Sequence, residues 1–304
     1  MRPARLTPRG RDGLSGRPAV VLVAHGSRDP RAAVATESLA RAVQVARPEW
    51  DVQASYLDHD GPRPLDILAS LGTRRAVLVP LLLTAAYHGR VDLPAVVRAA
   101  ESLPVSVTAT DVLGPASPLL LAAVSRRLDA ACRRLPETPL NADRGLSRLK
   151  GVSLEASRPP SGHVPLDEPL RMAGGDRGCS SSAGLDAVVL AAAGTRNAAA
   201  RETVAAAAAA LGARLGLPAA VGYASGPGGT AGEAVAALQG AGARRVGMAA
   251  YFLAPGLLYD VAVRSATQAG AVAIAEPLGA APELVQLVIA RAESNLDTPL
   301  AAAA

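Results

Sequence analysis

Short apolar runs alternate along the chain with longer segments of helix-compatible composition. The first run, AVVLVA at 19–24, ends at His-Gly-Ser-Arg, and residues 31–46 then have the composition of a helix. Short apolar runs that end in turn signals are typical of buried strands. The same alternation continues with apolar runs at 52–57, 76–83 and 105–109 and helix-like segments after Pro64, from Asp92 and at 117–134. The pattern predicts a parallel α/β lobe of four strands.

The pattern of the first lobe begins again in the second half of the chain. The segment VVLAAAGTRNAAARETV at 188–204 aligns with VVLVAHGSRDPRAAVATES at 20–38, which sets Gly194 on Gly26 and Arg196 on Arg28. Later apolar runs repeat the order of the first half, at 219–223, 245–253 and 271–275. The sequence therefore predicts two tandem flavodoxin-like lobes with a cleft between them, each with a four-stranded parallel sheet in the order 2-1-3-4.

Composition shifts set the expected domain boundaries. We expect a disordered basic tail at 1–18, an N-terminal catalytic lobe at 19–135, a disordered Pro/Gly/Ser/Arg-rich linker at 136–185 and a degenerate repeat lobe at 186–296. The tail lacks the apolar core of a signal peptide, and no apolar run approaches the roughly 20 residues that a membrane span needs. The two cysteines form no CxxC pair. We therefore expect a cytoplasmic protein without a membrane anchor.

The charged residues narrow the classes of partner and of chemistry. The net charge of +5 comes from scattered arginines, and aromatic residues make up only 2% of the chain, so no basic stripe with stacking residues is expected for nucleic acid. An anionic small molecule is the expected partner. Lys150 is the only lysine and lies in the expected linker, so no P-loop or Schiff-base lysine is available.

Two histidines follow strands that the predicted order makes neighbours. His25 stands at the carboxyl end of the first strand, and His88 follows the third strand. Ligands of open α/β sheets bind outside the carboxyl ends of the strands at such a switch point. Imidazoles bind divalent first-row metals and exchange protons near neutral pH, so the pair is a candidate catalytic and metal-binding site.

Acidic residues follow the second strand, in the segment ASYLDHD. Asp58 is a candidate metal ligand or proton relay beside the two histidines. If the strand extends this far, alternation places Asp58 and Asp60 on one side and His59 on the other. The alternative is that the stretch is already a loop, and His59 is interpreted as a solvent-facing loop residue.

Four further residues flank the histidines and are candidates for substrate binding: Ser27, Arg28, Tyr87 and Arg90. Arginine binds carboxylates through a bidentate fork, which suits a polycarboxylated substrate. Arg31 is interpreted instead as a solvated residue at a helix start.

The second half contains no histidine, and the position that aligns with His25 is Ala193. Histidine chemistry is therefore confined to the first lobe, and we expect one site per chain with the second lobe as scaffold.

The residues quoted above resemble the sirohydrochlorin chelatase family, the class II chelatases that work without ATP. The resemblance is carried by the HGSRDP opening, by His88-x-x-x-Asp92-Leu93-Pro94 and by the lobe duplication. It implies a lyase that inserts Fe²⁺ or Co²⁺ into sirohydrochlorin with release of two protons, in siroheme or cobalamin biosynthesis. It also implies His25 and His88 as the active-site pair, a divalent metal as substrate and no organic cofactor. Family members often have glutamate where this chain has Asp58, and the two fused lobes are compatible with a monomer.

Two other functions fit the same residues. A tetrapyrrole or metal carrier would bind through the two histidines without turnover. Histidine phosphatases also place a His-Gly pair after a first strand, although they open with Arg-His-Gly and here Ala24 precedes His25.

Overall fold

A computed structural model gives the structure of residues 16–72, 74–84, 92–115, 117–135 and 184–296. Nearly all of the expected tail and linker lies outside these residues, so their boundaries stay predictions. Among the described residues, no helix is both long and apolar enough to cross a bilayer.

Each half of the chain alternates strands and helices. The first half contains β1 (Ala19–Ala24), α1 (Pro30–Ala46), β2 (Asp51–Tyr56), α2 (Pro64–Ala69), β3 (Arg75–Pro80), α4 (Asp92–Ala100), β4 (Ser106–Ala109) and α5 (Pro118–Cys132). The second half contains β5 (Ala187–Ala192), α6 (Ala198–Leu215), β6 (Ala219–Tyr223), α7 (Ala231–Gly240), β7 (Val246–Tyr251), α8 (Leu257–Gln268), β8 (Ala273–Ile274) and α9 (Pro282–Leu296).

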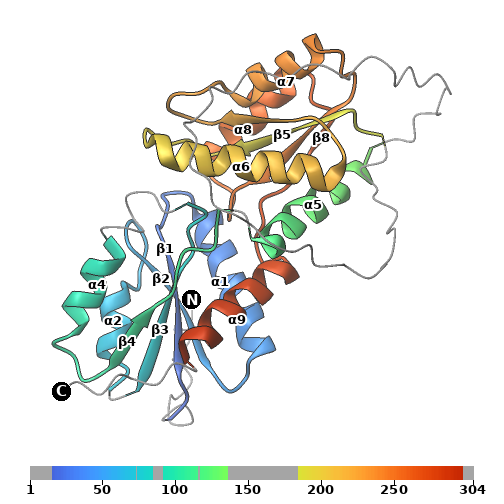
Figure 1. Cartoon of the computed structure of the whole chain (residues 1–304). Helices are drawn as coiled ribbons and strands as arrows, with labels where there is room; N and C mark the ends of the chain where they lie inside the picture. The colour runs from blue at the N-terminus through green and yellow to red at the C-terminus, as the bar shows by residue number, and fades with distance from the viewer. Residues whose placement is uncertain (1–15, 73, 85–91, 116, 136–183, 297–304) are drawn as a thin grey trace, which may run out of the picture.

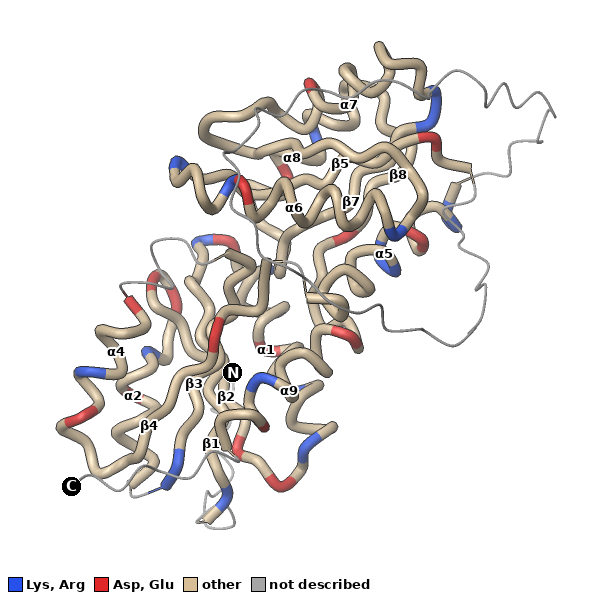
Figure 2. Tube along the Cα trace, viewed as in Figure 1, with Lys and Arg blue, Asp and Glu red and all other residues tan. Residues whose placement is uncertain are grey.

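The strands form two parallel four-stranded sheets with the same topology. Their orders are β2-β1-β3-β4 and β6-β5-β7-β8. In the described residues, Asp51 and Arg75 are the only charged residues on strands, each the first residue of its strand, and the other charges lie on helices and loops (Figure 2). Strands without interior charges suit a parallel sheet that is covered on both faces. The predicted fold class and strand order are confirmed.

The last helix of each half covers the sheet of the other half. α5 packs on β7 and β8 of the second sheet, while α9 packs on β3 of the first sheet and on α1 (Figure 1). The prediction that the helix at 117–134 completes the first lobe is therefore wrong. Apolar periodicity gives α5 a buried face, but two sheets of the same topology can both accept such a face, so the sequence did not select between them.

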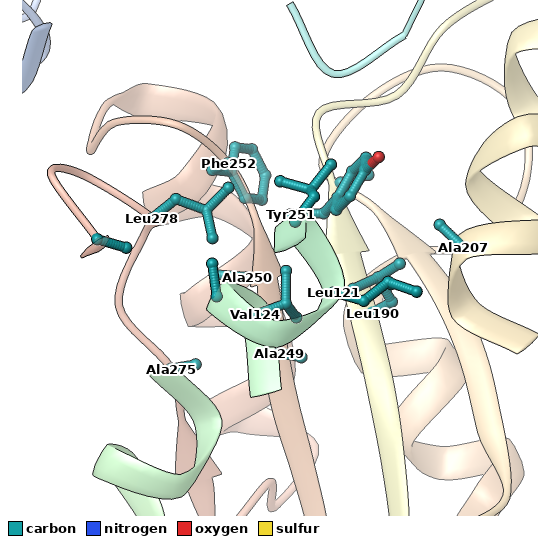
Figure 3. Packing of buried hydrophobic residues seen from close by; sticks show 14 of the residues in the cluster. Leu121, Val124, Leu190, Ala207, Ala249, Ala250, Tyr251, Phe252, Ala275 and Leu278 are labelled. Carbon is teal, nitrogen blue, oxygen red and sulfur yellow. The ribbon is translucent and has the colours of Figure 1, made fainter. Parts of the chain in front are cut away.

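One hydrophobic core consequently runs through both halves. Leu121 and Val124 of α5 pack with Ala249 and Tyr251 of β7 and with Leu278 (Figure 3). The same cluster includes residues of β1 and β3, whereas a smaller cluster fills the other face of the first sheet beneath α2 and α4. The exchange of α5 and α9 thus fixes the positions of the two sheets relative to each other.

Candidate functional site

The loop after β1 packs directly against the loop after β2. The amide of Asp58 donates to the carbonyl of His25 at 2.7 Å. Gly26 has φ +93°, and a Cβ there would lie 1.8 Å from the carbonyl oxygen of Asp58. Only glycine fits such a position, because a side chain would overlap the neighbouring backbone. The His-Gly pair therefore brings His25 beside the Asp58–His59 segment.

His25 and His59 lie next to each other at this edge. Their ring centroids are 6.4 Å apart and the ring planes differ by 8°. Both residues are exposed. β2 ends at Tyr56, so strand alternation does not extend to Asp58 and His59, and the alternative that this stretch is a loop holds. His59 adopts the left-handed φ of +61° in that loop. The turn directs the His59 ring back toward His25.

The Asp58 carboxylate lies between positive and polar groups. Its Oδ1 accepts the backbone N–H of His59 at 2.8 Å, and its Oδ2 is 3.6 Å from Nε2 of His59. That hydrogen bond, together with the electrostatic influence of the nearby His59, Arg63 and His25 side chains, holds the pKa of Asp58 below its usual range. Asp58 is therefore an anion across the neutral pH range and suits a divalent cation.

Ser27 shapes the turn that follows His25. Its amide donates to Oδ2 of Asp60 at 3.2 Å, and its Oγ accepts the amide of Asp29 at 3.1 Å. Asp29 in turn caps α1 by accepting the amide of Arg31. Arg28 is exposed and has no hydrogen bond or ion pair with another residue in the described part of the chain. Substrate binding by Ser27 and Arg28 stays a prediction.

The start of α8 in the second half faces this turn. The Arg31 guanidinium pairs with Asp29 at 2.5 Å and with Asp260 of α8 at 2.6 Å. A Cβ on Gly256 would lie 3.9 Å from Oγ of Ser27. Arg31 is half exposed, but it is not a solvated helix-start residue as expected: it joins the two halves beside the His25 loop.

Tyr87, His88 and Arg90 lie outside the described residues, and their roles stay predictions. In the sequence they lie in the segment between β3 and α4. Val23 of β1 pairs with Pro80 of β3, so this segment departs from the strand adjacent to the one that ends at His25.

No three His, Cys, Asp or Glu side chains are placed to hold one metal ion together, as far as the described residues go. An ion bound by His25 and Asp58 would therefore need a ligand from elsewhere, and the segment after β3 contains His88. A partial ligand set binds an ion less firmly than a closed four-ligand site.

The sequence-based reasoning underrated His59. The signal that could have found it is the internal repeat, because the residue after Asp58 aligns with Gly226, which has φ +81°. A histidine that replaces a glycine at a left-handed position carries backbone strain, and such strain clusters at functional sites.

The two parallel sheets of the same topology define a duplicated flavodoxin-like protein, and the candidate residues His25 and Asp58 lie at the carboxyl edge of its first sheet. The family model described as CbiX matches residues 19–131 and again 187–295, and the chain belongs to this family. The two matched segments correspond to the two halves described above.

Solved structures with the same fold cover nearly the whole chain. The sirohydrochlorin chelatase SirB from Bacillus subtilis subspecies spizizenii in complex with cobalt is 16% identical, with a TM-score of 0.62 over 93% of this chain and 97% of that chain. SirB from Bacillus subtilis with Fe³⁺ is 18% identical, with a TM-score of 0.63 over 92% and 96%. CbiX, described as the terminal enzyme for biosynthesis of siroheme in denitrifying bacteria, is 16% identical, with a TM-score of 0.55 over 91% and 99%. No curated protein matches the chain.

Proposed function

We propose that the chain is a sirohydrochlorin chelatase that inserts Fe²⁺ or Co²⁺ into the macrocycle with release of two protons. The observation that carries the proposal is the placement of His25 beside the anionic Asp58 at the carboxyl edge of the first sheet, opposite the start of α8. Membership in the CbiX family and the likeness to chelatase structures support it.

Insertion requires a group that delivers a metal ion and a group that accepts pyrrole protons. His25 and His88 are assigned both tasks, because neutral imidazole binds first-row metals and takes up protons near neutrality. Asp58 adds a negative charge that favours the ion, and His59 adds a third imidazole at the same edge. An incomplete set of protein ligands allows the ion to leave for the four nitrogens of the ring.

Substrate binding is assigned to the groups around the histidines. Arg28 and Arg90 would pair with peripheral carboxylates, while Ser27 and Tyr87 would contact the ring or its side chains. The second half has no histidine at the equivalent edge, so one site per chain is proposed. We further propose that the enzyme acts in the cytoplasm, needs no organic cofactor and functions as a monomer, in siroheme or cobalamin biosynthesis.

The test is anaerobic turnover of sirohydrochlorin by the full chain, followed by the absorbance of the macrocycle with Fe²⁺ and with Co²⁺ in excess. We expect multiple turnovers, with iron faster than cobalt. His25→Ala and His88→Ala should each abolish turnover, and His163→Ala, in the expected linker, is the matched histidine control.

Other outcomes of these measurements would assign the chain to a different functional class. Binding of one equivalent without turnover would indicate a carrier, and hydrolysis of phosphomonoesters would indicate a phosphatase. Full activity in both histidine variants would reject the site even if the wild type turned over.

A further inference from the structure

A pocket of about 310 Å³ lies at the carboxyl edge of the first sheet, beside the proposed site. Pro80 of β3 and Thr110 and Asp111 after β4 line its sheet side, while Leu93 of α4 and Arg291 of α9 line its helix side. An apolar depression lined by Leu93, Pro94 and Val97 adjoins it. The pocket is therefore built by the first sheet together with the last helix of the second half.

Arg291 brings an unused positive group to this pocket. Its Nε is buried and has no hydrogen-bond acceptor. Within the described part of the chain, its guanidinium forms no ion pair, and Asp111 on the pocket wall is not within ion-pair distance of it. A buried donor without an acceptor destabilises the fold, so folding alone does not account for arginine at this position.

The exchange of helices directs Arg291 toward the site. The Arg75 guanidinium, at the amino end of β3, donates to the carbonyl of Asn295 in the last turn of α9. α9 therefore runs antiparallel to β3, and its last turn lies at the amino end of that strand, away from the carboxyl edge. Side chains on a helix tilt toward its N-terminus. Arg291, one turn before Asn295, therefore points its guanidinium toward the carboxyl edge, where Pro80 meets the pocket (the run of α9 along the first sheet is visible in Figure 1).

The pocket and His25 share one edge of one sheet. β1 and β3 are adjacent, and neighbouring strands lie about 4.8 Å apart. A planar macrocycle placed over His25 extends across more than one such spacing, so its peripheral groups can reach the pocket.

We propose that Arg291 binds a carboxylate of the substrate through its guanidinium fork. The inference rests on the proposed function, in which that carboxylate is an acetate or propionate side chain of the tetrapyrrole. A carboxylate is favoured over a phosphate because Asp111 lines the same pocket and would repel a dianion more strongly. The second half of the chain thus contributes a substrate-binding residue and is not only a scaffold.

The test measures binding of metal-free sirohydrochlorin to the full chain by the fluorescence of the macrocycle, alongside Tm. For Arg291→Met we expect Kd to rise roughly tenfold, the loss typical of a hydrogen-bonded charge pair. Tm should stay the same or rise, because the variant removes an unpaired buried donor. Arg291→Lys should recover part of the affinity, and Asp111→Asn should lower Kd by about two- to threefold as a repulsive charge is lost.

The matched control is Arg264→Met, which removes a positive charge from an exposed residue of α8. Its Kd should stay within about twofold of wild type. An unchanged Kd in Arg291→Met overturns the inference, whatever its Tm. If the wild type binds sirohydrochlorin without turnover, the chelatase proposal alone is contradicted. If the wild type turns over and Arg291→Met binds normally, the role of the pocket alone is contradicted. If the wild type does not bind sirohydrochlorin, both are overturned.

Discussion

The loops after β1 and β5 have the same backbone and different chemistry. Gly26 and Gly194 have φ values of +93° and +96°, and a Cβ on either would lie 1.8 Å from a carbonyl oxygen of the loop that follows the neighbouring strand. Ser27 and Thr195 each accept the backbone N–H two residues further on, at 3.1 Å in both cases. The shape of the turn therefore belongs to the fold, since both halves build it.

The ionisable residues at the same positions are found only in the first half. Ala193 stands where His25 stands, and Ser225 takes the place of Asp58 and donates its hydroxyl to the carbonyl of Ala193. Gly226 takes the place of His59 at the left-handed position. Because the second half forms the same turn without these three side chains, folding does not require them, which favours a functional role for them in the first half.

The largest expected effect comes from exchanging the residues at the His25 position. His25→Ala should lower chelatase turnover by about 100-fold or more, the range lost with a general acid–base group. Its Tm should stay within about 2 °C of wild type because the second half tolerates alanine there. Steady-state turnover and a thermal melt check this, with Ala193→His as the matched control, for which we expect near-normal turnover. A large drop in Tm for His25→Ala would mean that the histidine is structural.

Adding a methyl group to Gly26 or Gly194 should destabilise the turn that both halves form. Gly26→Ala and Gly194→Ala should each reduce the free energy of unfolding by about 3 kcal/mol, because the Cβ overlaps a backbone carbonyl and φ is positive. Denaturant unfolding measures the loss. Only Gly26→Ala should also reduce turnover per folded molecule, and equal turnover losses in both variants would contradict a single site in the first half.

Replacing His59 by glycine, the residue at the equivalent position 226 of the second half, should change stability and turnover in opposite directions. His59→Gly relieves a left-handed conformation and should stabilise the fold by about 0.5–1 kcal/mol, while turnover falls several-fold as an imidazole leaves the site. Urea unfolding and turnover on the same preparation test both signs. A variant that is more stable and fully active would remove His59 from the site.

The smallest expected effect concerns the ion pairs between the halves. Arg31 is half exposed, so Arg31→Ala and Asp260→Ala should each shift Tm by only about 2 °C at low salt and less at high salt. The double variant should show less than the sum of the two shifts, because the residues contact each other. The i,i+4 pair of Glu37 and Arg41 within α1 serves as the matched surface pair. Strictly additive shifts would show that the contact contributes nothing.

The sequence by itself determined the two parallel sheets, their strand order and the strand-end position of His25. Apolar runs that alternate with helical segments are local signals, and the repeat made the second sheet recognisable from the first. Asp58 was also found from the sequence, because it lies just beyond the end of an apolar run.

The tertiary structure alone decided which sheet each final helix covers, and with it the position of Arg291. It also placed His59 beside His25 through a left-handed turn and paired Arg31 with Asp260. The physical reason is that an apolar helix face indicates that the helix packs against another element but does not indicate which one. Contacts between residues far apart in the chain depend on how whole elements pack, and no local pattern encodes them.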